Sequence, residues 1–391
     1  MTSVLVVDDS QFMRTVIGSI LARHGYDVSR ASNGERAVDA VREYEPDIVT
    51  MDVQMPQMDG IEAVERIMTK HPTRILMLSA HTADGADATL QALASGAIDF
   101  LEKPSGEVST DIAGLEDRLI EAIDGVEAAD ISAVARSRTA ASAQRIGGAG
   151  EATTGATATS NAQQSASPHS TDPESDQAVG RDDEAAPDED RTYQEHPTIV
   201  VGASTGGPKI IEQLLCSLPI ELDARVLVVQ HMPPEFTGRL AKRLDELCPY
   251  RVKEAEDGDR ISGGEVLVAH GDRHMQVPNS VAGRLKIRLT DEDPVHGVRP
   301  SIDVTMQSVA ETVAQPVVGI ALTGMGKDGA AGISAIHEAG GTTIAQDEET
   351  SPVFGIPKQA IATGAVDHVA PAEGITDQVV DSLSTEVTTH G

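Results

Sequence analysis

One segment of the chain is nearly free of large aliphatic side chains, and it divides the sequence into two parts that must fold separately. Between Glu151 and Pro197 the only large aliphatic residue is Val179, and small, polar and acidic residues dominate. Such a segment cannot bury enough apolar area to offset the entropy lost on ordering. We therefore expect a mostly disordered acidic linker over 129–196, joining a domain at 1–128 to a second at 197–385.

Both flanking parts alternate short apolar runs with amphipathic stretches such as Gln11–His24. This alternation predicts an α/β fold: two doubly wound parallel-sheet domains. A small antiparallel ribbon is expected where Leu285–Leu289 meets the segment around Gln276. The expected strands are Val4–Val7, Asp27–Arg30, Asp47–Met51, Ile75–Leu78, Ala97–Leu101, Thr198–Val201, Val226–Gln230, Val266–Ala269, Val317–Leu322 and Thr342–Ala345.

The charge balance excludes two classes of partner. Acidic residues number 62 against 30 Lys and Arg, giving a formal net charge of −32. A surface of this sign repels nucleic acid and anionic lipid, so we expect neither as a partner. At molar salt the Debye length is about 3 Å, so surface carboxylates hardly repel one another. The acid excess therefore indicates a halophilic cytosol.

The termini, apolar runs and cysteines point to a cytoplasmic chain. Met1–Ser10 lacks the basic start of a signal peptide, and the apolar runs, near ten residues at most, are too short for us to expect insertion into a bilayer. Only Cys216 and Cys248 occur, without metal-binding spacing. A disulfide framework is therefore not expected.

A cluster of acidic residues is predicted at one edge of the first sheet. Asp8 and Asp9 follow the first strand and Asp52 ends the Asp47–Met51 run, while Ser79 and Lys103 follow later strands. The carboxyl ends of parallel strands meet at one edge. Three carboxylates there suit Mg²⁺, which prefers oxygen ligands. Asp52 could then attack a phosphoryl group, while Lys103 and the Ser79 hydroxyl contact the transferred oxygens.

The sequences VLVVDDS, DIVTMDVQMPQMDGIEA, MLSAHT and AIDFLEKP resemble the two-component receiver domain, a flavodoxin-like fold, over about the first 125 residues. The resemblance implies that Asp52 is the phosphoacceptor and that Asp8 and Asp9 bind the metal with it. Ser79 and Lys103 would form the switch pair, and Phe100 matches the aromatic switch position.

The second domain opens with a strand, a tight turn and a probable helix. Residues 202–206, Gly-Ala-Ser-Thr-Gly, fit the G-x-S-x-G elbow, in which small neighbours expose the hydroxyl of Ser204. A glycine-rich turn before a helix could instead bind phosphate. An acid and a base at neighbouring strand ends would favour the nucleophile. His231 follows Val226–Gln230, and Asp328 lies beyond Val317–Leu322.

Two other histidines, His270 and His274, also follow a strand, so position alone favours His231 only modestly. The order Ser, His, Asp differs from that of ordinary α/β-hydrolases. Glycines at 324, 326 and 329 could permit a turn whose amides form an oxyanion hole.

The sequences VGASTGGP, VVQHMPPEFT, VRPSIDV, ALTGMGKDGAAG, AGGTTIAQDEETSPVFGIPKQAI and GAVDHV resemble the catalytic domain of the chemotaxis methylesterase family CheB. The resemblance runs from Pro197 to about Pro371 and implies the triad Ser204, His231 and Asp328. Thr205 and Met325 match positions whose amides would hold an oxyanion.

The two resemblances together imply a phosphorylation-activated enzyme that removes methyl groups from glutamyl esters of chemoreceptors and releases methanol. They also imply a histidine kinase as phosphodonor, Mg²⁺ in the receiver, no cofactor in the catalytic domain, and deamidation of receptor glutamines as a second activity. A non-catalytic, phosphorylation-switched binding module is the competing hypothesis, and the presence of all three triad residues argues against it.

Overall fold

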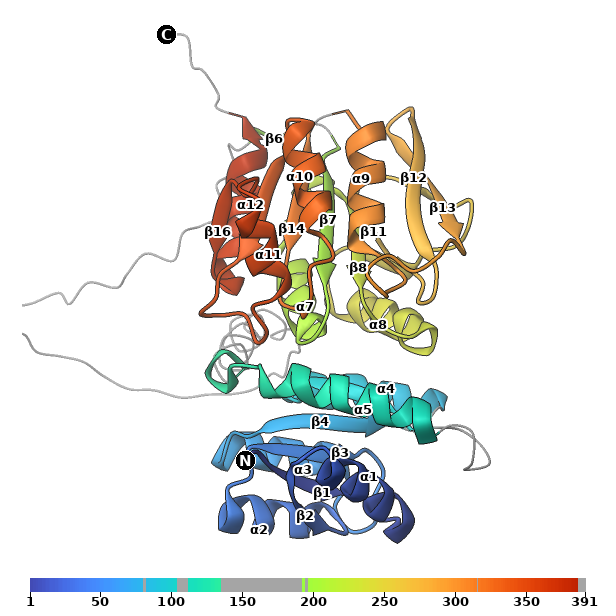
Figure 1. Ribbon diagram of the computed structural model, residues 1–391. Coiled ribbons are helices and arrows are strands. Elements are labelled where there is room, and N and C mark those ends of the chain that lie inside the picture. Colours follow the sequence, from blue (N-terminus) through green and yellow to red (C-terminus); the bar gives the residue numbers. More distant parts are fainter. Residues whose placement is uncertain (80–81, 104–111, 135–191, 194–195, 315, 386–391) are drawn as a thin grey trace, which may run out of the picture.

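The computed structural model describes residues 1–79, 82–103, 112–134, 192–193, 196–314 and 316–385 (Figure 1). The described chain forms two α/β domains, stacked one on the other. The sequence predicted this fold class, and the structure confirms it. Most of the expected linker lies outside the described residues. Its first part, 129–134, is described and packs against the body of the protein, with Ala129 and Ala133 buried.

The first domain is a five-stranded parallel sheet in the order β2-β1-β3-β4-β5. Its strand order reverses between β1 and β3, and in such sheets this switch point is where ligands bind. The strands are β1 (Ser3–Val7), β2 (Asp27–Ala31), β3 (Ile48–Asp52), β4 (Arg74–Ser79) and β5 (Asp99–Glu102), and the helices are α1 (Gln11–Arg23), α2 (Gly34–Tyr44), α3 (Gly60–Lys70), α4 (Ala83–Ala94) and α5 (Ile112–Glu127).

Helix starts in this domain follow from local sequence. The side chains of Ser10, Asn33 and Asp59 each accept a hydrogen bond from a backbone N–H in the first turn of α1, α2 and α3. Short polar side chains are favoured there because they satisfy donors that have no partner within the helix.

The second domain contains a seven-stranded parallel sheet in the order β16-β15-β14-β7-β8-β11-β9. Its strands are β7 (Thr198–Ala203), β8 (Arg225–Gln230), β9 (Arg251–Glu254), β11 (Glu265–Val268), β14 (Val317–Ala321), β15 (Thr342–Gln346) and β16 (His368–Ala370). The helices are α7 (Gly207–Ser217), α8 (Pro234–Leu247), α9 (Ile302–Thr312), α10 (Ala330–Glu338), α11 (Ile356–Ala362) and α12 (Ile375–Leu383). The switch point here lies between β14 and β7.

Two smaller sheets complete this domain. An antiparallel sheet joins β10 (Arg260–Ile261), β13 (Arg284–Thr290) and β12 (His274–Val281), so the expected ribbon is confirmed by the pairing of Gln276 with Arg288. The second sheet pairs β6 (Thr192–Tyr193) with β17 (Ser384–Thr385). All ten strands expected from the sequence are present, with ends shifted by at most two residues.

The expectation about the cysteines was wrong. Cys216, in the last turn of α7, and Cys248, directly after α8, form a disulfide. The two residues are 32 positions apart in the sequence. Helices α7 and α8 pack against each other, which brings their C-terminal ends together. Sequence spacing carries no signal for such a pair, because its proximity comes from helix packing.

The two domains meet through helices α4 and α5 on one side and α7 and α8 on the other (Figure 1). Arg239 of α8 forms an ion pair with Asp87 of α4, and the rings of Phe100 and Phe236 lie with their centroids 4.1 Å apart. The Asp130 N–H donates to the carbonyl of Pro352 at 2.8 Å. The first domain therefore covers the face of the second at which β7, β8 and β14 end.

Among the described residues, no helix is both long enough and apolar enough to cross a membrane.

Candidate active site

The acidic cluster of the first domain lies at its switch point. Asp8 and Asp9 follow β1, Asp52 ends β3, and oxygen atoms of all three lie within 4.8 Å of one another. Lys103 Nζ lies 2.8 Å from Asp8 Oδ2 and 2.7 Å from Asp52 Oδ1. The sequence predicted that these four residues would meet, and the strand ends bring them together. Burial raises the pKa of Asp52, and the nearby Lys103 ammonium opposes that shift.

Ser79 and Phe100 connect this cluster to the domain interface. The Thr89 hydroxyl of α4 donates to Ser79 Oγ at 2.9 Å, and the Ser79 hydroxyl is 3.4 Å from the carbonyl of Gly85. Ser79 therefore contacts the helix that packs on α7 and α8. Phe100, in β5, stacks on Phe236 of α8. Ser79 of the expected switch pair and Phe100 at the expected aromatic switch position thus each contact an element of the interface.

The second site begins at the turn after β7, where Ser204 lies. Its N–H donates to the Thr323 carbonyl at 3.0 Å. Its own carbonyl accepts hydrogen bonds from Gly207 N–H at 2.8 Å and Gln230 Nε2 at 2.9 Å. These contacts fix the turn between the strand and α7. The arrangement is the strand–turn–helix context that a nucleophile elbow requires.

Glycines at three positions make the turn possible. A Cβ on Gly202 would lie 2.4 Å from Cγ2 of Ile302. Gly206 has a φ of 78°, in the left-handed region that favours glycine. A Cβ on Gly324, at the neighbouring end of β14, would lie 2.6 Å from Cβ of Ser204. Larger residues at these positions would push the serine out of place.

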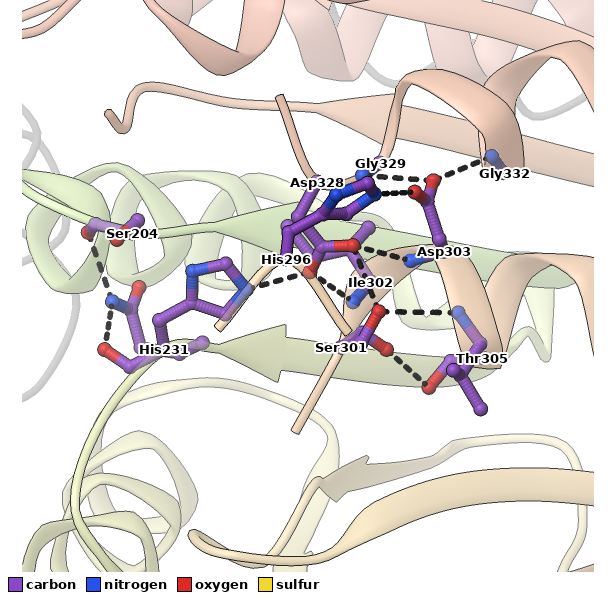
Figure 2. Close-up of polar contacts among 12 residues, drawn as sticks. Ser204, His231, His296, Ser301, Ile302, Asp303, Thr305, Asp328, Gly329 and Gly332 are labelled. Carbon is purple, nitrogen blue, oxygen red and sulfur yellow. Dashed lines mark hydrogen bonds and ion pairs between the residues drawn. The ribbon is translucent and has the colours of Figure 1, made fainter. Parts of the chain in front are cut away.

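His231 lies between Ser204 and Asp328 (Figure 2). Its Nε2 is 2.8 Å from Asp328 Oδ2, and both side chains are largely buried. The other ring nitrogen, Nδ1, is left for the serine. Among the described residues no hydrogen bond joins Ser204 Oγ to His231. Catalytic hydrogen bonds are often long until substrate binds. The three residues follow β7, β8 and β14, which are adjacent strands.

The competing histidines have other contacts. Buried His274 accepts a hydrogen bond on Nδ1 from the Ser301 N–H at 3.1 Å, and its Nε2 bonds to the Asp293 carbonyl. His270 Nδ1 contacts the carbonyl of Gly271. Neither residue lines the cavity that contains Ser204. Geometry therefore favours His231 as the base.

The N-terminus of α9 holds the carboxylate of Asp328. Its Oδ1 accepts from the Ser301 hydroxyl at 2.8 Å and the Asp303 N–H at 3.1 Å, and its Oδ2 accepts from the Ile302 N–H at 2.7 Å. Although burial opposes it, the bond to His231 and these N–H groups leave the pKa of Asp328 below its usual range. A carboxylate therefore faces the imidazole, as orienting and stabilising an imidazolium requires.

The amides of Thr205 and Met325 are available as donors. Neither N–H donates to any acceptor in the part of the chain that the structure describes. Gly324 and Gly326, with φ values of 159° and 91°, flank Met325 and turn its backbone. Both residues line the cavity with Ser204, so their amides are candidates for binding an oxyanion.

The cavity of about 370 Å³ is built by both domains. The second domain contributes Ser204, His231 and Asp328, and the first contributes β5 and α5. Two hydrogen bonds close its edge: Thr205 Oγ1 donates to Asp99 Oδ2 at 2.6 Å, and the Gly206 N–H donates to the Ile98 carbonyl at 3.2 Å.

Comparison with known proteins identifies both halves of the chain. The family described as CheB methylesterase matches residues 199–379, and the family described as response regulator receiver domain matches 4–110. A protein-glutamate methylesterase/protein-glutamine glutaminase of Haloarcula marismortui is 51% identical over 98% of each chain. The chain belongs to the CheB methylesterase family.

Two further proteins are similar to this chain. The protein of the same name from Halobacterium salinarum is 47% identical, with 98% of this chain and 99% of that one covered. The crystal structure of the CheB methylesterase catalytic domain of Thermotoga maritima is 40% identical, covers 48% of this chain and 99% of its own, and has a TM-score of 0.46. The haloarchaeal origin of the Haloarcula marismortui and Halobacterium salinarum relatives also agrees with the halophilic composition of this chain.

The sequence argument missed Ser301, Asp303 and His296. Ser301 is the N-cap of α9, and its side chain bonds both to that helix and to Asp328. A serine followed by an apolar and an acidic residue is a usual helix-start signal, which could have drawn attention to the segment. His296 lines the cavity but follows no strand, so a search of strand ends could not find it.

Proposed function

We propose that this chain is a phosphorylation-activated protein-glutamate methylesterase that hydrolyses glutamyl methyl esters on chemoreceptors and releases methanol. The observation that supports it best is the 2.8 Å contact between His231 Nε2 and Asp328 Oδ2, in the cavity that also contains Ser204. A serine, an imidazole and a carboxylate so arranged are suited to acyl transfer.

In this reaction Ser204 Oγ attacks the ester carbonyl of the methylated glutamate, and His231 takes the hydroxyl proton on Nδ1. Asp328 fixes the tautomer and stabilises the imidazolium. The amides of Thr205 and Met325 bind the oxyanion of the tetrahedral intermediate. His231 then protonates the departing methanol.

Water enters by the reverse route, cleaves the acyl-enzyme, and leaves a glutamate carboxylate on the receptor. Each turnover adds one negative charge to the receptor. A receptor glutamine passes through the same acyl-enzyme with ammonia as the leaving group, so deamidation is the second activity that this site supports.

Asp8, Asp9 and Asp52 would hold Mg²⁺ in the receiver, and the three clustered carboxylates fit this hard cation. When bound, the ion supplies positive charge that allows an anionic phosphodonor to approach. Asp52 accepts the phosphoryl group from a histidine kinase, and Lys103 contacts the transferred oxygens.

The receiver controls the esterase by covering its cavity in the unphosphorylated state. Support comes from the Asp99–Thr205 and Ile98–Gly206 hydrogen bonds, one residue and two residues beyond the nucleophile. When Ser79 turns toward a phosphoryl group on Asp52, its contacts with α4 change, and α4 packs on α7 and α8. Phosphorylation thereby loosens the interface.

The catalytic assignment can be tested by methanol release from receptor membranes carrying radiolabelled methyl esters. With the phosphorylated protein, His231→Gln should reduce release to background, whereas His270→Gln, a matched control outside the cavity, should retain most activity. A severe loss in His270→Gln with a mild one in His231→Gln would show that the base was misassigned.

Control by the receiver can be tested separately. The fragment from residue 197 onwards should release methanol faster than the unphosphorylated whole chain, and phosphorylation should close most of that gap. Equal rates for the fragment and the unphosphorylated chain would contradict occlusion by the receiver.

A further inference from the structure

Beside the catalytic carboxylate lies a second buried carboxylate, Asp303, in the first turn of α9. Its Oδ1 accepts hydrogen bonds from the N–H groups of Gly329 at 2.9 Å and Gly332 at 2.7 Å, at the start of α10. Asp328 directly precedes that helix start and binds the N-terminus of α9 in return. Each carboxylate therefore binds the N-terminus of the other's helix: Asp303 binds the start of α10, and Asp328 binds the start of α9. The helix dipole and the free N–H groups favour negative charge at both places.

This reciprocal arrangement fixes both the carboxylate and the backbone of Asp328. Its oxygens are held by α9, while the backbone that carries it is held by Asp303 through Gly329. If Asp303 released α10, two N–H groups at the start of that helix would lose their shared acceptor, and the loop carrying Asp328 would gain freedom. The orientation of His231 would loosen with it, since Asp328 is the group that orients this ring.

Asp303 has a histidine partner of its own. His296 Nε2 lies 3.0 Å from Asp303 Oδ2 (Figure 2). His296 has a left-handed φ of 54° and lines the cavity that contains Ser204. The site thus contains two His–Asp pairs, His231–Asp328 and His296–Asp303, with their carboxylates adjacent.

These residues do not form a good metal site, although ligand atoms of His296, Asp303 and Asp328 lie within 4.8 Å of one another. Both oxygens of each carboxylate already accept hydrogen bonds from N–H or O–H donors. A cation would have to displace those donors. The arrangement is therefore built to hold carboxylates in place.

We propose that His296 and Asp303 are positioning residues for the esterase: the pair locks Asp328 on the helix start of α9 and balances the charge next to His231. This inference rests on the proposed function. Neither residue is a nucleophile, base or oxyanion donor, and both act through Asp328. Asp303→Asn removes the carboxylate, whereas His296→Gln removes the ring that hydrogen-bonds with it, so the two changes should move the acidic limb of the pH–rate profile in opposite directions.

Burial raises the pKa of Asp303, the adjacent Asp328 adds to the shift, and its hydrogen bonds with Gly332, His296 and Gly329 oppose it. Loss of the Asp303 charge removes a carboxylate from beside the His231–Asp328 pair and disfavours the imidazolium. Loss of His296 removes the hydrogen bond to Asp303 Oδ2, leaves that carboxylate less compensated, and so favours the imidazolium of His231. Other titratable or charged groups line the same cavity: Lys327 of this domain and Asp99, Glu102, Arg118 and Glu121 of the receiver. Buried His274 accepts a hydrogen bond from the N–H of Ser301, whose hydroxyl donates to Asp328.

The test uses the full-length phosphorylated protein and three variants of the pair. Asp303→Ala removes the oxygen that accepts from both N–H groups of α10, Asp303→Asn keeps an amide oxygen in that place, and His296→Gln removes the ring. We expect kcat for methanol release to fall about 100-fold in Asp303→Ala, since displacement of a catalytic group by about 1 Å costs that much. Asp303→Asn should recover part of this loss, and KM should change little.

The acidic limb of the pH–rate profile distinguishes the two explanations, because loss of a purely structural residue would not shift it. It should shift to lower pH in Asp303→Asn and to higher pH in His296→Gln. The rate at which Ser204 reacts with a fluorophosphonate probe should show the same shifts. In that reaction the Oγ–P bond forms, the P–F bond breaks and His231 takes the proton. This readout does not depend on the receptor substrate.

The chain offers a matched control in a third His–Asp pair. His337 Nδ1 lies 3.3 Å from Asp367 Oδ1, and Asp367 Oδ2 accepts from the N–H and hydroxyl of Thr343, at 2.8 Å each. None of these residues lines the cavity. Asp367→Asn should lower the melting temperature without changing kcat or the acidic limb.

Two results would overturn the inference. If Asp303→Asn and Asp303→Ala change only the melting temperature, as Asp367→Asn does, the pair is purely structural. If His296→Gln abolishes Ser204 labelling as fully as His231→Gln, His296 is itself the base. Failure of the wild type to release methanol, with normal Ser204 labelling, would instead contradict the proposed substrate and leave the positioning role to be decided by the labelling rates.

Discussion

The hydroxyl of Thr205 donates a 2.6 Å hydrogen bond to Asp99 across the domain interface. Thr205 directly follows Ser204, and its amide is a candidate oxyanion donor. The receiver therefore contacts the catalytic turn itself. A change in the receiver that breaks this contact would remove one of the two hydrogen bonds that cover the turn at the proposed nucleophile.

The first prediction concerns pH. Burial raises the pKa of Asp99, with the Thr205 bond partly opposing it. Since the docked pKa lies above that of the free carboxyl, docking is favoured most at low pH and weakens as pH rises through the docked value. Basal methanol release by the unphosphorylated chain should therefore rise with pH relative to the phosphorylated chain. Asp99→Asn cannot ionise and should flatten this ratio, so an unchanged pH dependence would count against the contact.

The second prediction concerns Phe100, whose ring stacks on Phe236 at a centroid distance of 4.1 Å. Such pairs contribute about 0.5–1.5 kcal/mol beyond their buried area. Phe100→Ala should therefore raise basal activity by roughly 2- to 10-fold and leave the activity of the phosphorylated chain nearly unchanged. Basal rates of methanol release measure this directly. A lower basal rate would mean that the ring pair does not hold the closed arrangement.

The third prediction concerns Asp52. Asp52→Asn should not incorporate label from a radioactive small phosphodonor, because an amide cannot accept the phosphoryl group. Chelation of Mg²⁺ should have the same effect on the wild type, since Asp8, Asp9 and Asp52 are the carboxylates placed to hold the ion. Acyl phosphates hydrolyse readily. Label that persists in Asp52→Asn, or label that resists hydrolysis, would therefore show that the phosphate is on another residue.

The fourth prediction concerns the disulfide between Cys216 and Cys248. Bonds of this kind typically stabilise by about 2–4 kcal/mol, mainly by restricting the unfolded chain. Reduction, or Cys216→Ser, should therefore lower the melting temperature of the catalytic domain by about 5–10 °C. Calorimetry with and without reductant measures this. Identical melting curves would show that the bond contributes nothing to stability.

The sequence predicted which candidate site residues lie close together where those residues follow the ends of parallel strands. Asp8, Asp52 and Lys103 meet because parallel strands finish at one edge, which the alternation of strands and helices already implied. Ser204 and His231 follow the same logic, since β7 and β8 are neighbours. In these cases the position of a residue in the sequence pattern determines its position in space.

Sequence reasoning failed where proximity depends on packing between distant elements. The start of α9 meets Asp328 across 25 to 27 residues, and no periodicity predicts that contact. The Asp99–Thr205 bond spans two domains and 106 residues. The edge strands β9 and β16 were also missed. In β9 one buried valine stands among charged residues, and β16 is only three residues long, so neither has the apolar run that indicates a buried strand.

The most direct measurement is methanol release from radiomethylated receptor membranes by the phosphorylated protein and its Ser204→Ala variant. Replacing a triad nucleophile typically costs on the order of 10⁶ in rate. The variant should therefore fall to background while keeping the melting temperature and the phosphorylation of the wild type. Near-wild-type release by Ser204→Ala would contradict the assignment of this chain as a serine esterase acting through Ser204, His231 and Asp328.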